Sequence, residues 1–223
     1  MSTPSAEIVS EATIDMVTHL DVGPGGIDRF LDLVADRRSP LIKYRRGSLT
    51  LVSPSRAHER GAERLDGLIK AICAELDIDY QATATTLYRR PDRDSGIVAD
   101  KTYYLAHEPD VREVEGSIDL AINPPPDLAI EVVVTHDPAK SLAICQELGI
   151  PEVWVYWLKR GVLEFLSLDP EGRYEPTPAS RSFPFLPAAE VLPWLQTGEA
   201  EPDNRWERRL RLWVRTELAP RRG

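Results

Sequence analysis

The stretch PDLAIEVVV, residues 126–134, decides the fold of this chain. It is a nearly continuous run of strand-forming apolar residues, which is typical of a strand covered on both faces. A helical pattern follows directly, from Asp137 to Gly149, and a second apolar strand pattern, PEVWVYW at 151–157, follows the helix. This order predicts an α/β fold in which a mixed central sheet is flanked by helices.

Glu131 interrupts the apolar run and is the first candidate site residue. A carboxylate is costly to bury unless a metal, a cation or hydrogen bonds hold it. Asp100 interrupts a second strand pattern, IVADKTYYL at 97–105, in the same way. Because one polar connection separates the two patterns, we expect neighbouring strands whose carboxylates meet at one end of the sheet. The alternative is that each carboxylate forms a structural ion pair or caps a loop.

Three further residues near Glu131 are candidates for the same site. Two carboxylates repel each other unless a cation lies between them, and oxygen ligands suit a hard cation such as Mg²⁺ or Mn²⁺. Asp127, four residues earlier on the same strand face, is a third candidate ligand or a solvated strand entry. Lys140, in the first turn of the helix, is the candidate catalytic cation or an exposed surface lysine. His136 is a candidate for the border of the site.

His58 lies on the apolar face of a helical pattern that runs from Ser55 to about Leu76. A lone histidine on such a face is typical of a structural residue with its hydrogen bonds satisfied. The chain contains no GxSxG, P-loop or GxGxxG motif. The sequence therefore argues against a serine hydrolase and against a nucleotide-binding fold.

Length and composition indicate a soluble globular protein. The chain has 223 residues, of which 42% are apolar and 28% charged. No apolar stretch approaches the roughly 18 residues of a membrane span. Cys73 and Cys145 lack CxxC spacing, which argues against zinc and against a disulfide framework, and we expect a reducing cytoplasm. The net charge of −9 does not favour binding of a polyanion over the whole surface.

The remaining patterns divide the chain into three segments. Residues 1–25 are polar and aperiodic and predict a loose N-terminal arm. Residues 26–198 form the main domain, and residues 199–223 form a basic C-terminal helix. The main domain is expected to contain helices at 26–38, 55–76 and 188–196, and strands at 41–53, 79–89, 97–105 and 162–168.

The C-terminal helix has an apolar face with arginines around it. Trp206, Leu210, Trp213 and Val214 lie on this face at helical spacing. The pattern predicts a helix that docks on the core or on a partner subunit, and the alternative is a phosphate contact through the arginines. We expect a homodimer built partly on this helix.

Four segments of the chain resemble a known family. They are LTLVSPSRAHE (49–59), GIVADKTYYL (96–105), PPPDLAIEVVVT (124–135) and LGIPEVWVYW (148–157), and their order and spacing also fit. Over residues 26–168 the chain resembles the Uma-two-like predicted endonucleases, a bacterial family of the PD-(D/E)XK restriction-endonuclease superfamily. The resemblance implies a restriction-endonuclease-like core and metal-dependent cleavage of phosphodiester bonds.

The resemblance also implies roles for particular residues. Asp100 matches the family's first metal-binding aspartate, and Glu131 matches its second acidic residue. The family's lysine comes from the helix after that strand and aligns with Ser141, whereas Lys140 lies one position earlier. Ser141 is also near the centre of the apolar face of this helix, so the Lys140 stem must reach past the helix end to enter the site.

The residues leave two hypotheses for function. The first is a hydrolase: a metal-dependent endonuclease that binds Mg²⁺ or Mn²⁺ through Asp100 and Glu131 and acts on nucleic acid, with DNA favoured. In this hypothesis Lys140 stabilises the attacking water or the developing charge. The second is a catalytically degenerate nuclease fold that acts as a binding or assembly module, which the one-residue offset of Lys140 and the acidic net charge favour.

Overall fold

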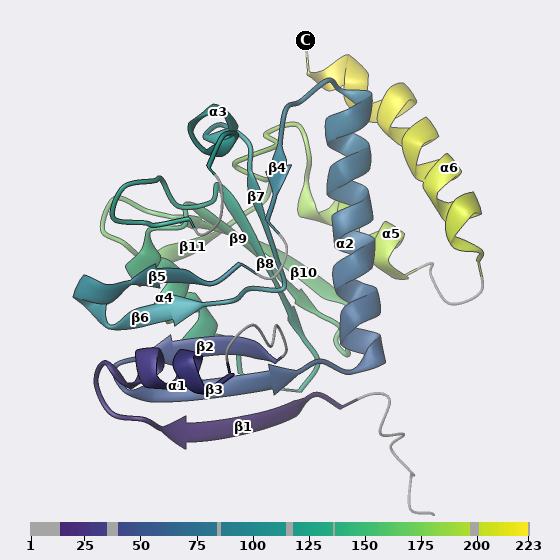
Figure 1. Cartoon of the computed structure of the whole chain (residues 1–223). Coiled ribbons are helices and arrows are strands. Elements are labelled where there is room, and N and C mark those ends of the chain that lie inside the picture. The colour runs from purple at the N-terminus through teal and green to yellow at the C-terminus, as the bar shows by residue number, and fades with distance from the viewer. Residues whose placement is uncertain are drawn as a thin grey trace, which may run out of the picture.

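The computed structural model describes residues 14–34, 40–83, 86–114, 118–135, 137–196 and 201–222. These residues form an α/β structure with two sheets (Figure 1). One sheet is antiparallel throughout, and its strands come from the N-terminal half of the chain. The other is mixed and is flanked by helices, as the sequence predicts.

The mixed sheet is built around β8 (Leu128–Val133), in which every residue is buried. β8 runs parallel to β9 (Glu152–Trp157), and α4 (Ala139–Leu148) connects the two strands. All other neighbours in this sheet are antiparallel. The strand order is β11-β10-β9-β8-β7-β4, with β4 at Gln81–Ala82, β7 at Lys101–Tyr104, β10 at Val162–Leu168 and β11 at Tyr174–Thr177.

The antiparallel sheet includes a strand where the sequence predicted a loose arm. Its order is β1-β3-β2-β6-β5, with β1 at Met16–Asp21, β2 at Leu41–Arg45, β3 at Ser48–Ser53, β5 at Tyr88–Arg90 and β6 at Ser95–Ile97. β1 pairs with β3 along its whole length, but most of its side chains are exposed. Backbone pairing without a buried face leaves no alternating apolar pattern, so sequence periodicity did not reveal this strand.

The single strand predicted at 97–105 is divided between the two sheets. β6 ends at Ile97 in the antiparallel sheet, and β7 begins at Lys101 in the mixed sheet. The backbone N–H of Val98 still bonds to the carbonyl of Ile42 in β2, at 2.7 Å. The chain then crosses between the sheets at residues 98–100, which places Asp100 at their junction.

Helices α2 (Arg56–Glu75) and α4 cover opposite faces of the mixed sheet. α2 begins at the cap residue Ser55, whose hydroxyl accepts the N–H of His58, and its buried stripe packs with Ile130 and Val132 of β8. α4 packs on the other face, with Ala129 and Val133. Because side chains alternate along a strand, Glu131 points to the face that α4 covers.

The C-terminal helix α6 (Asp203–Trp213) docks on the core of the same chain. Trp206 is buried in the cluster that α2 forms, and its ring N–H donates to the carbonyl of Trp194 in α5 (Ala188–Gln196) at 3.0 Å. The guanidinium of Arg64 stacks on the Trp206 ring at 4.3 Å. The remaining α-helices are α1 (Gly26–Val34) and α3 (Glu108–Val111), and short turns of other helix types lie at Pro91–Arg93, Val214–Leu218 and Ala219–Arg221. Every helix among the described residues is too short or too polar to cross a membrane.

Candidate active site

Glu131 sits in the middle of β8, and its carboxylate is held by two donors from other elements. The ammonium of Lys43 in β2 forms an ion pair with Oε1 of Glu131. The hydroxyl of Ser141 in α4 donates to the same oxygen at 2.9 Å. The side chains of Lys43 and Glu131 are only 4% and 3% exposed, so the pair lies in the protein interior. These contacts compensate the cost of burying the carboxylate.

Asp100 lies beside Glu131, at the junction of the two sheets. Its Oδ2 accepts the backbone N–H of Val132, the residue after Glu131, at 2.6 Å. Its Oδ1 lies 2.9 Å from Nε2 of His58 in α2, and its side chain is 2% exposed. The structure therefore places the two predicted carboxylates at the neighbouring strands β7 and β8 of one sheet, where Lys43 pairs with Glu131 and His58 faces Asp100.

His58 stands between two carboxylates rather than on a purely apolar surface. Nδ1 lies 3.0 Å from Oδ2 of Asp15, and Nε2 faces Asp100. Burial by itself lowers the pKa of His58, but the hydrogen bonds and charges of Asp100 and Asp15 outweigh it and raise the pKa to about 10. His58 is therefore an imidazolium at neutral pH. Each of its ring nitrogens lies about 3 Å from a carboxylate oxygen, and one of these carboxylates, Asp100, is a candidate site residue.

Lys43 is the residue of this site that sequence reasoning missed. Burial lowers its pKa, but the charges of Glu131 and Asp100 and the hydrogen bond to Glu131 outweigh burial and raise the pKa above its usual value. The ammonium is therefore charged. The available signal was a lysine between Ile42 and Tyr44 in a strand with a buried centre, since a buried lysine needs an anionic partner.

Lys140 points to the antiparallel sheet and not to Glu131. Its amine donates to the carbonyl and hydroxyl of Ser48 at 2.9 and 3.0 Å, and to Oγ1 of Thr50 at 2.8 Å. Burial, with the charges of Lys43 and Arg45, lowers its pKa. At the start of α4, the contact with Glu131 is made by Ser141, as the helical phase of the two residues requires.

The other two candidates near β8 have different outcomes. Asp127 anchors a loop: its carboxylate accepts the backbone N–H groups of Leu105 and His107 at 2.6 and 3.0 Å, and lies 2.6 Å from Nδ1 of His107. Asp127 is therefore neither a solvated strand entry nor oriented as a metal ligand, since it is buried and its oxygens bind the chain that follows β7. His136 lies outside the described residues.

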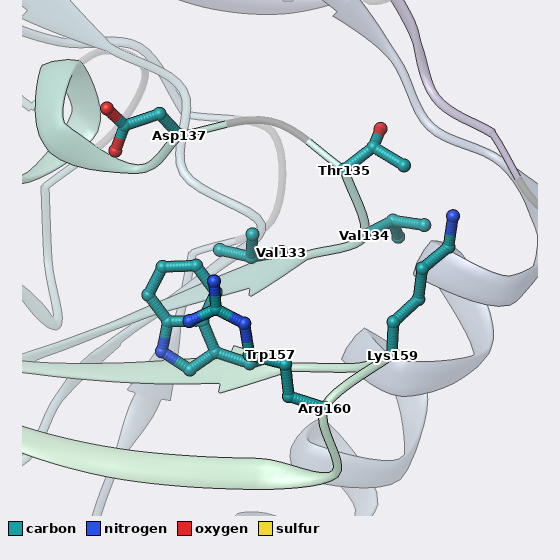
Figure 2. A pocket seen from close by; sticks show the side chains of 7 residues that line it. All are labelled: Val133, Val134, Thr135, Asp137, Trp157, Lys159 and Arg160. Carbon is teal, nitrogen blue, oxygen red and sulfur yellow. The ribbon is translucent and has the colours of Figure 1, made fainter.

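Two adjoining cavities open beyond the C-terminal end of β8. The first, of about 470 Å³, is lined by Val133, Val134, Thr135, Asp137, Trp157, Lys159 and Arg160 (Figure 2). The second, of about 390 Å³, also has Lys159 and Arg160 in its wall, together with Arg60 and Arg64 of α2. The guanidinium of Arg160 stacks on the Trp157 ring at 4.6 Å. We call the two cavities the basic cleft, because four cationic side chains and one carboxylate line them.

A family model described as "Putative restriction endonuclease", Uma2, matches residues 27–201. The chain belongs to the Uma2 family. Among solved structures, the crystal structure of a putative nuclease belonging to DUF820 from Anabaena variabilis is similar, with a TM-score of 0.53 and 18% identity. The match covers 76% of this chain and 98% of the other, and it shows a shared fold. No curated protein matches the chain.

The donors of this Uma2-family site fit a hard divalent cation in kind. Restriction-endonuclease-like families generally use a divalent metal, and Mg²⁺ is commonly held by one or two carboxylates together with water and substrate phosphate. Asp100 and Glu131 supply such oxygens, and both lie close enough to Lys43 for their charges to raise its pKa. No group of three or more His, Cys, Asp or Glu side chains with metal-ligand geometry occurs among the described residues. Water and phosphate would therefore complete the coordination, and a bound cation would compete with Lys43 for Glu131.

Proposed function

We propose that this chain is a metal-dependent endonuclease that hydrolyses phosphodiester bonds in nucleic acid, with DNA the favoured substrate. One observation carries the proposal: Asp100 accepts a hydrogen bond from the residue next to Glu131, so two carboxylates share a buried site in a Uma2-family chain. A divalent cation held by Asp100 and Glu131 supplies a Lewis acid for a phosphoryl oxygen.

The surrounding residues orient the two carboxylates before any substrate binds. The N–H of Val132 and the imidazolium of His58 fix Asp100. Ser141 orients Glu131, and Lys43 neutralises its charge until a cation binds. Ligands held by packing and hydrogen bonds do not need to reorganise during the reaction, which is the main way such sites lower a barrier. In this proposal Lys140 is the outer cation, which neutralises charge on the bound phosphate.

The basic cleft is the proposed path of the nucleic-acid backbone. It begins at Val133, two residues beyond Glu131, and Arg160 and Lys159 lie in the walls of both of its cavities. Arginines of the C-terminal segment form ion pairs with carboxylates of the same chain: Arg209 with Glu201, Arg211 with Glu75 and Glu207, Arg215 with Glu75, and Arg221 with Glu190. Arg64 of the cleft likewise pairs with Asp203. The cleft is the proposed phosphate-binding surface because it adjoins β8 and holds Lys159 and Arg160 in both of its cavities.

Plasmid cleavage tests the proposed activity. Wild-type protein with Mg²⁺ or Mn²⁺ should cut plasmid DNA, and Glu131→Gln and Asp100→Asn should each lose at least about 100-fold in rate, because each removes a charged ligand. Glu63→Gln is the matched control, since Glu63 is an exposed carboxylate that pairs with Lys101. Equal trace activity in all four proteins would reject the proposed nuclease activity.

A second function, binding or assembly by a degenerate nuclease core, is favoured by one observation. Lys43 and His58 already offset the charges of Glu131 and Asp100. The net charge of the site therefore differs from zero by no more than about one before a metal binds. Calorimetric titration with Mn²⁺ discriminates between the two functions. No heat of binding at millimolar Mn²⁺ would support the degenerate core.

We also propose a homodimer in a reducing cytoplasm. Leu212 is an apolar residue of α6 that is 59% exposed, and it offers a contact for a second copy. Cys73 and Cys145 are both buried thiols, and the proposal of a reducing compartment rests on their unpaired spacing in the sequence. Leu212→Asp should halve the mass measured by light scattering, and an unchanged mass would reject this contact.

A further inference from the structure

The buried cation at Glu131 comes from β2 and not from α4. Lys43 reaches Glu131 across 88 residues of sequence, and its side chain is almost fully enclosed. Lys140 is much closer to Glu131 in the sequence, but its amine donates to Ser48 and Thr50 in β3. Lys43 and Thr50 are direct cross-strand partners, so the two lysines are neighbours with different targets.

We propose that Lys43 is the catalytic cation of this site, an assignment that rests on the proposed nuclease function. Ser141 and Lys43 both contact Oε1 of Glu131. A lysine at position 141 would extend from α4 toward Oε1 of Glu131, the oxygen that the Lys43 ammonium contacts from β2. The site therefore holds its ammonium on a strand of the antiparallel sheet, with a serine at the helix position.

Stability alone gives no reason to place a lysine at this strand position. A buried ion pair contributes little net stability compared with apolar residues of similar size, because both charges lose their hydration. Lys43 nevertheless lies between the buried Ile42 and Tyr44. Compared with an apolar residue at this position, what it brings to the site is a positive charge. In a water-poor environment a fixed ammonium stabilises developing negative charge more strongly than it does in solvent.

The reaction assigned to the site is hydrolysis. A water oxygen forms a bond to phosphorus, one P–O ester bond breaks, one water proton passes to solvent, and the departing oxygen takes a proton from solvent. Lys43 keeps its own protons throughout. Its N–H groups donate to the attacking water and to a non-bridging phosphoryl oxygen, whose negative charge grows as the new bond forms.

The test compares lysine substitutions in the full-length protein. Lys43→Met removes the charge and keeps an unbranched stem, and Lys140→Met does the same at the outer lysine. Lys101→Met is the matched control, because Lys101 also pairs with a glutamate, Glu63, outside the site. Each protein is assayed for plasmid cleavage at saturating Mn²⁺, for Mn²⁺ affinity without DNA by electron paramagnetic resonance, and for thermal unfolding.

Lys43→Met should cleave at least about 100-fold more slowly than wild type, the loss expected when one charged donor is removed from a reacting centre. Its Mn²⁺ affinity should be equal to or tighter than that of wild type, because Glu131 loses a competing cation. Lys140→Met should lose less than about tenfold, and Lys101→Met should be unchanged. A Lys43→Met protein within threefold of wild type would overturn the assignment.

A charge-relocating double variant keeps the test decisive if Lys43→Met unfolds. Lys43→Ser with Ser141→Lys moves the ammonium to α4 while nearly conserving the side-chain volume of the site. Recovery of at least about tenfold in cleavage over Lys43→Ser alone would support the assignment. A folded double variant without recovery would overturn it. An inactive wild type would overturn the nuclease function itself, whereas an active wild type with an equally active Lys43→Met overturns only the role of Lys43.

Discussion

The carboxylate of Asp15 should be one of the most important single side chains for the stability of this fold. It precedes β1, outside the residues that match the family model. Its Oδ1 accepts the backbone N–H of Ser55 at 2.8 Å, and its Oδ2 lies 3.0 Å from Nδ1 of His58. Asp15 thus fixes the first turn of α2 and the imidazolium that faces Asp100.

The expected magnitude follows from the burial of this pair. The side chains of His58 and Asp15 are 2% and 0% exposed. Asp15→Ala leaves two buried donors, the Ser55 N–H and Nδ1 of His58, without this acceptor, at about 1–3 kcal/mol each, whereas the charge of His58 still faces Asp100. Asp15→Ala should therefore lower the free energy of unfolding by about 2–6 kcal/mol, and Asp15→Asn, which keeps an acceptor, by roughly half of it.

Urea denaturation followed by circular dichroism measures this effect. Asp32→Ala is the control, because Asp32 is an exposed carboxylate of α1, and its loss should change the free energy of unfolding by less than about 0.5 kcal/mol. An Asp15→Ala protein as stable as this control would refute the reasoning. It would mean that the segment before β1 does not hold His58 in solution.

Three further predictions concern other parts of the chain. Burial raises the pKa of Glu147, but two arginines and a serine hydroxyl outweigh it and hold the pKa below its usual value of 4.5. The resulting stability is present above pH 4.5 and is lost as the pH falls through the folded pKa, so Glu147→Gln should flatten the acid limb of a urea-denaturation series. Lys159→Glu with Arg160→Glu should weaken DNA binding measured by fluorescence anisotropy in Ca²⁺, and should reduce the salt slope by about two, whereas unchanged binding would remove the basic cleft from the account. Gly61→Ala should not give the usual helix gain of about 1 kcal/mol in thermal unfolding, because its Cβ would lie 3.3 Å from a β8 side chain; a clear gain would contradict that packing.

Local periodicity was sufficient for the central elements of the core, although it merged β6 and β7 into one strand. The apolar run of β8 and the stripe of α2 are the centre of the core, and both were predicted from their patterns. The same patterns singled out Asp100 and Glu131, because a carboxylate inside an apolar strand is a local exception. What the structure adds is that the two residues are neighbours through the Val132 N–H.

Long-range partners could not be predicted in this way. Lys43 and Glu131 are 88 residues apart, and Asp15 and His58 are 43 apart. Each pairing depends on how the two sheets meet, and the sequence concealed that junction within a single strand pattern at 97–105. The prediction that Lys140 serves Glu131 relied on proximity in sequence, whereas the direction of the first turn of α4 turns Lys140 to β3 and Ser141 to Glu131.

The position of a bound metal tests the central claim most directly. Crystals of the protein soaked in Mn²⁺ would give an anomalous-scattering peak at the ion. We predict a peak within bonding distance of one oxygen from Asp100 and one from Glu131, with the Lys43 ammonium displaced from Oε1. An intact pair of Lys43 and Glu131 with no peak between the carboxylates, at a Mn²⁺ concentration that supports cleavage, would contradict the account.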